Sequence, residues 1–295
     1  MECESFIEQN KSNEKPLFRW TAGKSKHYNV ILIESIKTFS KLYGDIADGV
    51  VVFNSDFPCK NFKCFENYLN KYNIKCIFAD EKSLSFAPKN YAWKFYPPRL
   101  RIHTHEIFLD SDFILLSKGN HILEFLSGSY AFANTTRLPK FGDYFDKIKG
   151  HKSLRGMGIN GGIFGFPPNY DIKNIIENNH FGWDNHLNQQ GLTAFLVLNI
   201  DHKIIPPPYF YNFYNCNCSI ITSFKCKFPK NIYKNEEFTD KMEGFHFCTG
   251  LSDNINPAWK YYAQKPFGQV NKDRKDLPED INLWASGESK ASILF

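Results

Sequence analysis

The sequence has no run of roughly 18 uninterrupted apolar residues, the length that a membrane-spanning helix needs. Its first residues, MECESFIEQNKSNEKP, are acidic and polar, whereas a signal peptide would be basic and then apolar. We therefore expect a cytoplasmic protein without a transmembrane segment. Peripheral contact with a membrane from the inside is compatible with this composition.

Several signatures of metal and nucleic-acid sites are also missing. The eight cysteines are scattered without a repeated CxxC pair, so we expect free thiols and no zinc site. The net charge of +5 is small and dispersed, which predicts no nucleic-acid partner, since such proteins carry a basic stripe. A weak positive field remains compatible with a small substrate that bears phosphate.

Apolar side chains are plentiful enough for a large core. Of the 295 residues, 42% are hydrophobic and 23% are charged, as in an ordinary globular protein. Aromatic residues make up 17%, and the 29 phenylalanines fit core packing better than a set of sugar-stacking surfaces. This length indicates one large domain, or one domain with a small appendage.

The first hundred residues alternate between strand and helix patterns. Strands are expected over 16–22, 49–54 and 74–79, and helices over 25–43 and 65–72. The strand GVVVFN (49–54) is apolar on both faces, as in a parallel sheet that is covered on both sides. The alternation predicts the α/β class, with an open sheet flanked by helices.

The rest of the chain continues this alternation. Pro97 and Pro98 should kink or restart the helix that begins at Ala92, because proline does not fit a helix interior. A strand is expected at 107–109 and a second apolar run at 113–116. Further helices are expected over 119–126, 171–178 and 183–195, and further strands over 130–135, 159–166, 196–199, 203–205 and 244–248. We expect residues 1–15 to be a loose lead-in, 16–268 a single catalytic domain, and 269–295 a charged tail.

Two carboxylates interrupt the apolar stretch HEIFLDSDFILL (105–116). Asp110 and Asp112 follow a strand, and ligands bind at the carboxyl ends of strands in an open α/β sheet. An i, i+2 pair in extended chain points both side chains the same way, so the carboxylates should converge. A divalent cation such as Mg²⁺ or Mn²⁺ relieves their repulsion and takes substrate phosphates as further ligands. The simpler alternative is a solvated turn.

Four motifs in order carry a family resemblance. The segment AWKFYPPRLRIHTHEIFLDSD (92–112) resembles the approach to the DxD motif of GT-A-fold glycosyltransferases. NGGIF (160–164), NQQGL (188–192) and HFCTG (246–250) followed by KPF (265–267) resemble later motifs, and the order is most similar to family 8 enzymes and their relatives. The resemblance implies a Rossmann-like open mixed sheet in one catalytic domain.

The resemblance also implies a metal and a donor site. Asp110, Asp112 and His246 would hold Mn²⁺ or Mg²⁺, and a UDP-sugar would be the donor. The other residues that would contact the nucleotide and its diphosphate are Trp20, Thr21, Ala22, Arg99, Ser111, Gly250 and Lys265. The segment between His246 and Lys265 is longer than in relatives.

The residues that would contact the donor and acceptor sugars come mainly from the two middle motifs. Asn160, Gly161, Gly162 and Gln190 would bind substrate, and Asn188 and Gln189 would act in catalysis together with Asp184. The family has an acid where Asn188 stands. Asp184, one helical turn earlier, is expected to take over part of that role or to cap the helix.

The implied reaction is metal-dependent transfer of a sugar from a nucleotide-diphosphate sugar to a hydroxyl of a saccharide or glycoconjugate, with retention. A nucleotidyl or phosphoryl transferase would also use paired acids and a metal, but the sequence has no GxxxxGK[ST] loop. A non-catalytic sugar-binding protein on the same fold is a third interpretation, which the presence of both acids and His246 disfavours.

Overall fold

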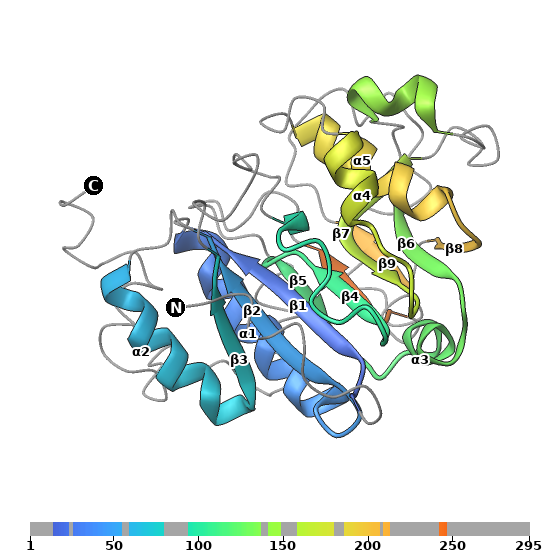
Figure 1. The fold of residues 1–295 in the computed structure, drawn as a ribbon. Helices are drawn as coiled ribbons and strands as arrows, with labels where there is room; N and C mark the ends of the chain where they lie inside the picture. The colour runs from blue at the N-terminus through green and yellow to red at the C-terminus, as the bar shows by residue number, and fades with distance from the viewer. Residues whose placement is uncertain are drawn as a thin grey trace, which may run out of the picture.

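The fold is an open mixed sheet with helices on both faces (Figure 1). It is taken from a computed structural model. The residues that the structure describes are 14–23, 26–54, 59–79, 94–136, 141–148, 158–179, 186–206, 209–212 and 242–246. The expected lead-in at 1–15 lies mostly outside these ranges, and the expected tail at 269–295 lies wholly outside them.

The amino-terminal half follows the expected alternation. The elements are β1 (Leu17–Ala22), α1 (Lys26–Tyr43), β2 (Asp48–Phe53), α2 (Cys59–Leu69), the 3-10 helix η2 (Asn70–Tyr72) and β3 (Ile74–Phe78). The three strands pair in parallel, in the order β3-β2-β1. In β2 every residue from Gly49 to Phe53 is buried, which confirms the prediction from the apolar run.

The second half of the sheet is mixed. β4 (Glu106–Leu109) pairs in parallel with β1 and antiparallel with β7 (Gly158–Phe166). β6 (Ala131–Thr136) and β8 (His202–Ile205) complete the seven-stranded sheet, whose order is β3-β2-β1-β4-β7-β6-β8. The prediction of an open mixed α/β sheet is therefore confirmed.

A second, small sheet adjoins the large one. β5 (Phe113–Leu115) pairs antiparallel with β10 (Gly244–His246), and β10 pairs in parallel with β9 (Phe210–Asn212). These strands come from widely separated parts of the sequence. The small sheet thus brings the segment after Asp112 next to the segment that carries His246.

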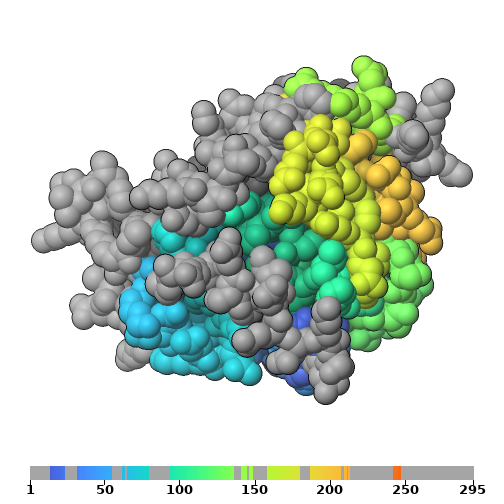
Figure 2. Space-filling model, in the orientation of Figure 1, coloured from blue at the N-terminus to red at the C-terminus, as the bar shows by residue number. Residues whose placement is uncertain are grey.

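Two apolar cores cover opposite faces of the large sheet. On one face, side chains such as Phe18, Trp20 and Ile107 pack with α1, α2 and α3 (Asn120–Ser127). On the other, Phe108 and Phe164 pack with the elements α4 (Lys173–Asn178), α5 (His186–Leu198) and the 3-10 helix η5 (Gly142–Lys147). The space-filling view shows the early elements, in blue and cyan, and the later ones, in green and yellow, on opposite sides of the molecule (Figure 2).

Two expectations about local structure were wrong, and one segment had been left without an expectation. Residues 196–198 belong to α5 and not to a strand, because Leu196 and Val197 continue the buried face of that helix. Residues 94–100 contain no α-helix, since Pro97 and Pro98 cannot be accommodated in one. The aromatic segment after residue 206, for which the sequence predicted no element, contains β9.

A buried ion-pair network holds the segment that leads into β4. Glu106, fully buried, accepts from Arg19 at 3.2 Å and from Arg99 at 3.1 Å. Arg19 also donates to the carbonyls of Tyr96 (2.9 Å) and Pro97 (2.6 Å). These contacts fix the proline-containing segment against the sheet. Among the described helices, none combines the length and apolar character needed to cross a membrane.

Candidate metal and donor site

The acidic pair lies on a turn that connects the two sheets. β4 ends at Leu109, and the Asp110 amide donates to the Gly162 carbonyl at 2.9 Å. The Phe113 amide then donates to the Asp110 carbonyl at 3.0 Å, which closes a turn before β5. We expected the two carboxylates to converge because of an extended chain. They do converge, but the turn is what brings them together.

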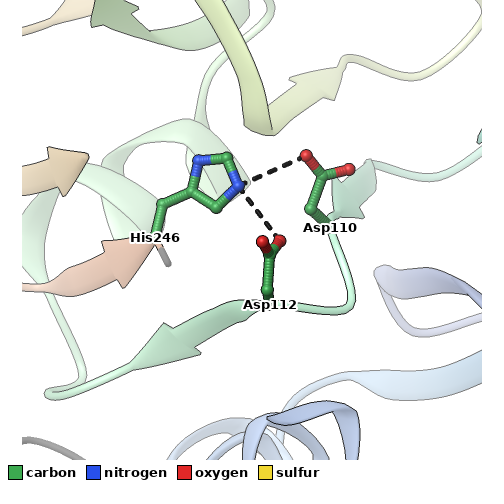
Figure 3. A group of neighbouring side chains, drawn as sticks. All are labelled: Asp110, Asp112 and His246. Carbon is green, nitrogen blue, oxygen red and sulfur yellow. Dashed lines mark hydrogen bonds and ion pairs between the residues drawn. The ribbon is translucent and has the colours of Figure 1, made fainter. Parts of the chain in front are cut away.

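His246 completes a cluster of three possible metal ligands (Figure 3). Its Nε2 lies 3.1 Å from Asp112 Oδ1 and 3.4 Å from Asp110 Oδ2. One ligand atom from each residue lies within 4.8 Å of the other two. Asp112 and His246 are 5% exposed, so this cluster is largely shielded from water, whereas the Asp110 side chain is 26% exposed and opens the cluster on one side.

The geometry of this cluster suits a divalent cation. Two ligands in adjacent positions around an octahedral ion at about 2.1 Å are separated by about 3.0 Å, close to the observed distances from His246 to the two acids. Two carboxylate oxygens and one imidazole nitrogen form a donor set that Mn²⁺ accepts readily. Three ligands leave further coordination positions for water or for phosphate oxygens.

A bulge in β7 makes room for the cluster. Ala133 on β6 pairs with Phe164 while Asn134 pairs with Asn160, so residues 161–163 are extra on β7 at this point. Bulges of this kind often re-aim the chain beside functional sites. A Cβ built on Gly162 would lie 2.3 Å from His246 Nδ1, so only glycine leaves space for the imidazole. Gly162 therefore leaves space for the His246 ring, and its expected contact with substrate stays a prediction.

Lys94 is a site residue that the sequence analysis missed. Its ammonium forms an ion pair with Asp110 Oδ1 and donates to the Gly161 carbonyl at 2.8 Å. The Asp110 carboxylate thus faces Lys94 with one oxygen and His246 with the other. Gly161 has no side chain to block the lysine, since a Cβ there would lie 3.1 Å from Nζ. Lys94 falls in the segment 92–112, which carries the family resemblance, and this position is the feature of the sequence that could have identified it.

Gln189 lies beside the same glycine. It is on α5 and 6% exposed, and a Cβ built on Gly161 would lie 2.7 Å from its Nε2. Within the part of the chain that the structure describes, this buried Nε2 has no hydrogen-bond partner. Buried polar groups nearly always have one, so an unpaired donor here calls for an explanation. A bound substrate oxygen would supply it.

Other residues from the two middle motifs have structural contacts. The Asn188 amide accepts from the Asp143 backbone at 2.9 Å and donates to the Asp143 carboxylate at 2.8 Å, which ties η5 to α5. Asn160 accepts from the Gly162 amide at 2.7 Å and so shapes the bulge. Gln190 is 5% exposed on α5.

Arg99 lies at the other end of β4 from Asp110. All five of its N–H donors are in use: one on Glu106, two on the carbonyls of Pro167 (3.1 Å) and Tyr170 (2.8 Å), and two on the carbonyls of Arg101 (2.8 Å) and Thr104 (2.7 Å). This arrangement gives Arg99 no donor for a diphosphate. Its observed role is to hold the segment before β4.

Trp20 is also part of the structure rather than of an open surface. It is fully buried, and its Nε1 donates to Ser35 Oγ at 2.9 Å. Thr21 and Ala22 follow it at the end of β1. Since Trp20 pairs with Leu109, Thr21 lies next to Asp110 along the edge of the sheet.

Four further predicted residues have little or no description. Ser111 is half-buried in the turn between the two acids. Asp184, Gly250 and Lys265 lie outside the described residues.

Comparisons with known proteins agree with this fold. No protein-family model matches the sequence, and no curated protein matches it at a significant level. A solved structure of the galactosyltransferase LgtC with donor and acceptor sugar analogs is 13% identical, covers 92% of this chain and 95% of its own, and gives a TM-score of 0.50. The structure of an active-site mutant of LgtC is 11% identical, covers 91% and 99%, and gives a TM-score of 0.53. The chain therefore has the GT-A fold of nucleotide-sugar glycosyltransferases.

Proposed function

We propose that this protein is a metal-dependent glycosyltransferase that moves a sugar from a nucleotide-diphosphate sugar to a hydroxyl of a saccharide or glycoconjugate. The observation that carries the proposal is the cluster of Asp110, Asp112 and His246 at the carboxyl edge of the parallel strands. The GT-A fold supports it, because open α/β sheets bind ligands at that edge.

Asp110, Asp112 and His246 would hold Mn²⁺ or Mg²⁺. When bound, the ion supplies Lewis-acid stabilisation of the negative charge on the departing diphosphate. Imidazole nitrogen among the ligands favours Mn²⁺ over Mg²⁺, which prefers oxygen. The donor is proposed to be a UDP-sugar, with Thr21, Ala22 and Ser111 bordering the nucleotide.

Lys94 is proposed as the cation that neutralises the diphosphate. Its ammonium forms an ion pair with Asp110, one of the residues that would hold the ion, so Lys94 would add a positive charge next to a diphosphate bound at this site. A fixed positive group beside the forming charge lowers the barrier more than one in water would. Arg99 is left out of this role, and Lys265 and Gly250 remain proposed diphosphate contacts.

Gln189 is proposed to donate to a sugar oxygen through its Nε2, which has no hydrogen-bond partner among the residues that the structure describes. We propose transfer with retention, in which a phosphate oxygen of the leaving group helps to accept the proton of the acceptor hydroxyl. Asn160 would act through the shape of the bulge. Asp184 and Gln190 are proposed to help orient the sugars, and the order of motifs favours family 8 and its relatives.

The decisive test is binding of nucleotides with and without metal. Thermal unfolding is followed with UDP, GDP or CMP, each with and without Mn²⁺, and hydrolysis of a panel of nucleotide-sugars is then measured. We expect UDP to stabilise the wild type only when Mn²⁺ is present, and the variant D110N/D112N to lose this effect. Absence of stabilisation by every nucleotide would favour a non-catalytic protein on this fold. Release of pyrophosphate from a nucleoside triphosphate and a sugar phosphate would instead indicate a nucleotidyltransferase.

A further inference from the structure

Asn212 on β9 lies directly beside His246 on β10. The two residues are register partners in a parallel pair, so their side chains project from the same face of neighbouring strands. The Asn212 Oδ1 lies 3.1 Å from His246 Nδ1. The opposite ring nitrogen, Nε2, is the one that faces Asp110 and Asp112.

The two nitrogens of the imidazole therefore have different partners. A nitrogen that binds a metal must present its lone pair, which in a neutral imidazole leaves the proton on the other nitrogen. With an ion bound at Nε2, that proton would sit on Nδ1, where the side-chain oxygen of Asn212 lies at hydrogen-bond distance to accept it. Such an acceptor fixes both the tautomer and the rotation of the ring.

The Asn212 side chain is itself held in place. Its Nδ2 donates to the Thr135 carbonyl on β6 at 2.7 Å. Because that contact requires the amide nitrogen, the amide oxygen is the atom that faces His246. The bond to β6 links the small sheet to the large one behind the metal ligands.

We infer that Asn212 is a positioning residue that orients the His246 imidazole, and fixes its Nε2 lone pair, toward a divalent cation at Asp110 and Asp112. This inference rests on the proposed metal site and adds a residue outside the motifs on which that site was recognised. Loss of a hydrogen-bond acceptor behind a ligating histidine typically weakens metal binding by about 10–100-fold.

The test compares N212L with N212D, using Mn²⁺ alone as the probe. Both substitutions remove the bond to the Thr135 carbonyl and share that structural loss. N212L also removes the acceptor of the Asn134 Nδ2 donor at 3.0 Å, and measurement in a His246→Ala background separates this loss from an effect through the imidazole. Only N212D keeps an oxygen acceptor for His246 Nδ1. The dissociation constant for Mn²⁺ is measured by the EPR signal of free Mn²⁺, and thermal unfolding without metal checks the fold.

We expect N212L to weaken Mn²⁺ binding by about 10–100-fold and N212D to bind at least as tightly as the wild type. N212D also adds a negative charge that attracts a cation, so its affinity alone does not separate the two effects. The loss of Mn²⁺ affinity caused by N212L is therefore measured again in a His246→Ala background, where it should be less than about twofold. N178L, on an exposed helix position of α4, should leave Mn²⁺ binding unchanged.

Two outcomes overturn the inference in different ways. If N212L binds Mn²⁺ as tightly as the wild type, or if it weakens binding equally with and without His246, Asn212 does not act through the imidazole and the metal site itself stands. If the wild type binds Mn²⁺ no better than D110N/D112N, the proposed metal site is wrong, and the inference about Asn212, which depends on that site, is wrong as well.

Discussion

At the scale of single residues, the carboxylate of Asp110 lies between Lys94 and the proposed metal site. Asp110 gives one oxygen to Lys94 and turns the other toward His246 and the metal position. In the metal-free protein the lysine offsets part of the negative charge that would otherwise attract the ion. In the proposed mechanism the same lysine binds phosphate oxygens of the donor.

We therefore predict opposite effects of K94M on binding and on transfer. Removal of a charge-assisted contact should leave Asp110 more available, so Mn²⁺ should bind about tenfold more tightly. Transfer should fall by about 100-fold or more in kcat, because a fixed cation is lost at the diphosphate. Equilibrium binding of Mn²⁺ and initial rates at saturating Mn²⁺ measure the two effects.

The control for this prediction is K203M. Lys203 is paired with Glu124 on the surface, so its replacement removes one positive charge at the far edge of the sheet. It should change neither quantity. If K94M weakened metal binding, Lys94 would be supporting the acidic cluster instead of competing with the ion.

At the scale of elements, the bulge in β7 gives two adjacent glycines different neighbours. Gly161 faces Lys94 and Gln189, whereas Gly162 faces the His246 ring. The bulge lies on the side of β7 that pairs with β6, where residues 161–163 are extra, while Ile163 to Phe166 pair without interruption with β4. The local backbone thus serves the metal ligand at one position and the proposed donor contacts at the next.

G162A and G161A should consequently have different phenotypes. A methyl at Gly162 would overlap the imidazole, so Mn²⁺ affinity should fall by about tenfold or more. A methyl at Gly161 meets the ends of flexible side chains, so metal affinity should change little while the KM for the donor rises. Titration with Mn²⁺ and donor saturation curves distinguish the two. Equal losses of metal affinity would contradict this assignment of the bulge.

The start of β4 provides a pH-dependent contribution to stability. Burial lowers the pKa of His105 from its ordinary 6.5, the nearby charge of Arg99 adds to this, and a hydrogen bond to the Gly128 carbonyl opposes it. As pH falls through 6.5, the unfolded chain therefore takes up this proton before the folded one does. Folding stability is lost in that range.

We predict that H105Q loses less stability than the wild type on acidification. The free energy of unfolding by urea is measured for both proteins between about pH 8 and about pH 5.5, and the slopes are compared rather than the absolute values. H103Q, at an exposed position, provides the control for replacement of a histidine outside the buried contact. Parallel slopes for H105Q and the wild type would show that His105 does not contribute.

At the scale of the whole molecule, the Glu106 network joins segments that are far apart in sequence. It connects β1 through Arg19, the segment before β4 through Arg99, and the turn after β7 through the carbonyls of Pro167 and Tyr170. A buried pair of this kind is costly to break, since removal of one partner leaves an uncompensated charge. The network holds the framework on which Lys94 and Asp110 lie.

E106Q should destabilise the protein by about 3–5 kcal/mol, because two buried arginines lose their counter-charge. Urea unfolding measures the change. E124Q, which breaks the exposed pair with Lys203, should have a much smaller effect. If the stability of E106Q matched that of E124Q, the network would have no special role in the fold.

Local patterns in the sequence were sufficient for much of the architecture. The strand and helix alternation of the first half depends on the spacing of apolar residues, which follows from backbone geometry alone. The acidic pair, together with the order of the later motifs, was enough to predict that Asp110, Asp112 and His246 lie together as possible metal ligands. Leu196 to Leu198 were mistaken for a strand because a short apolar run fits either a buried helix or a strand.

The sequence by itself determined the α/β class and the acidic pair Asp110 and Asp112, because both depend on residue type and short-range spacing, whereas His246 was named only through the family resemblance. Only the tertiary structure decided what surrounds them. The register of β9 and β10 places Asn212 beside His246, and the β7 bulge places the Gly161 carbonyl where Lys94 donates to it. Arg99 donates its hydrogen bonds to carbonyls that include one from a distant segment, Pro167. Such contacts are set by the pairing of remote strands, which no local pattern encodes.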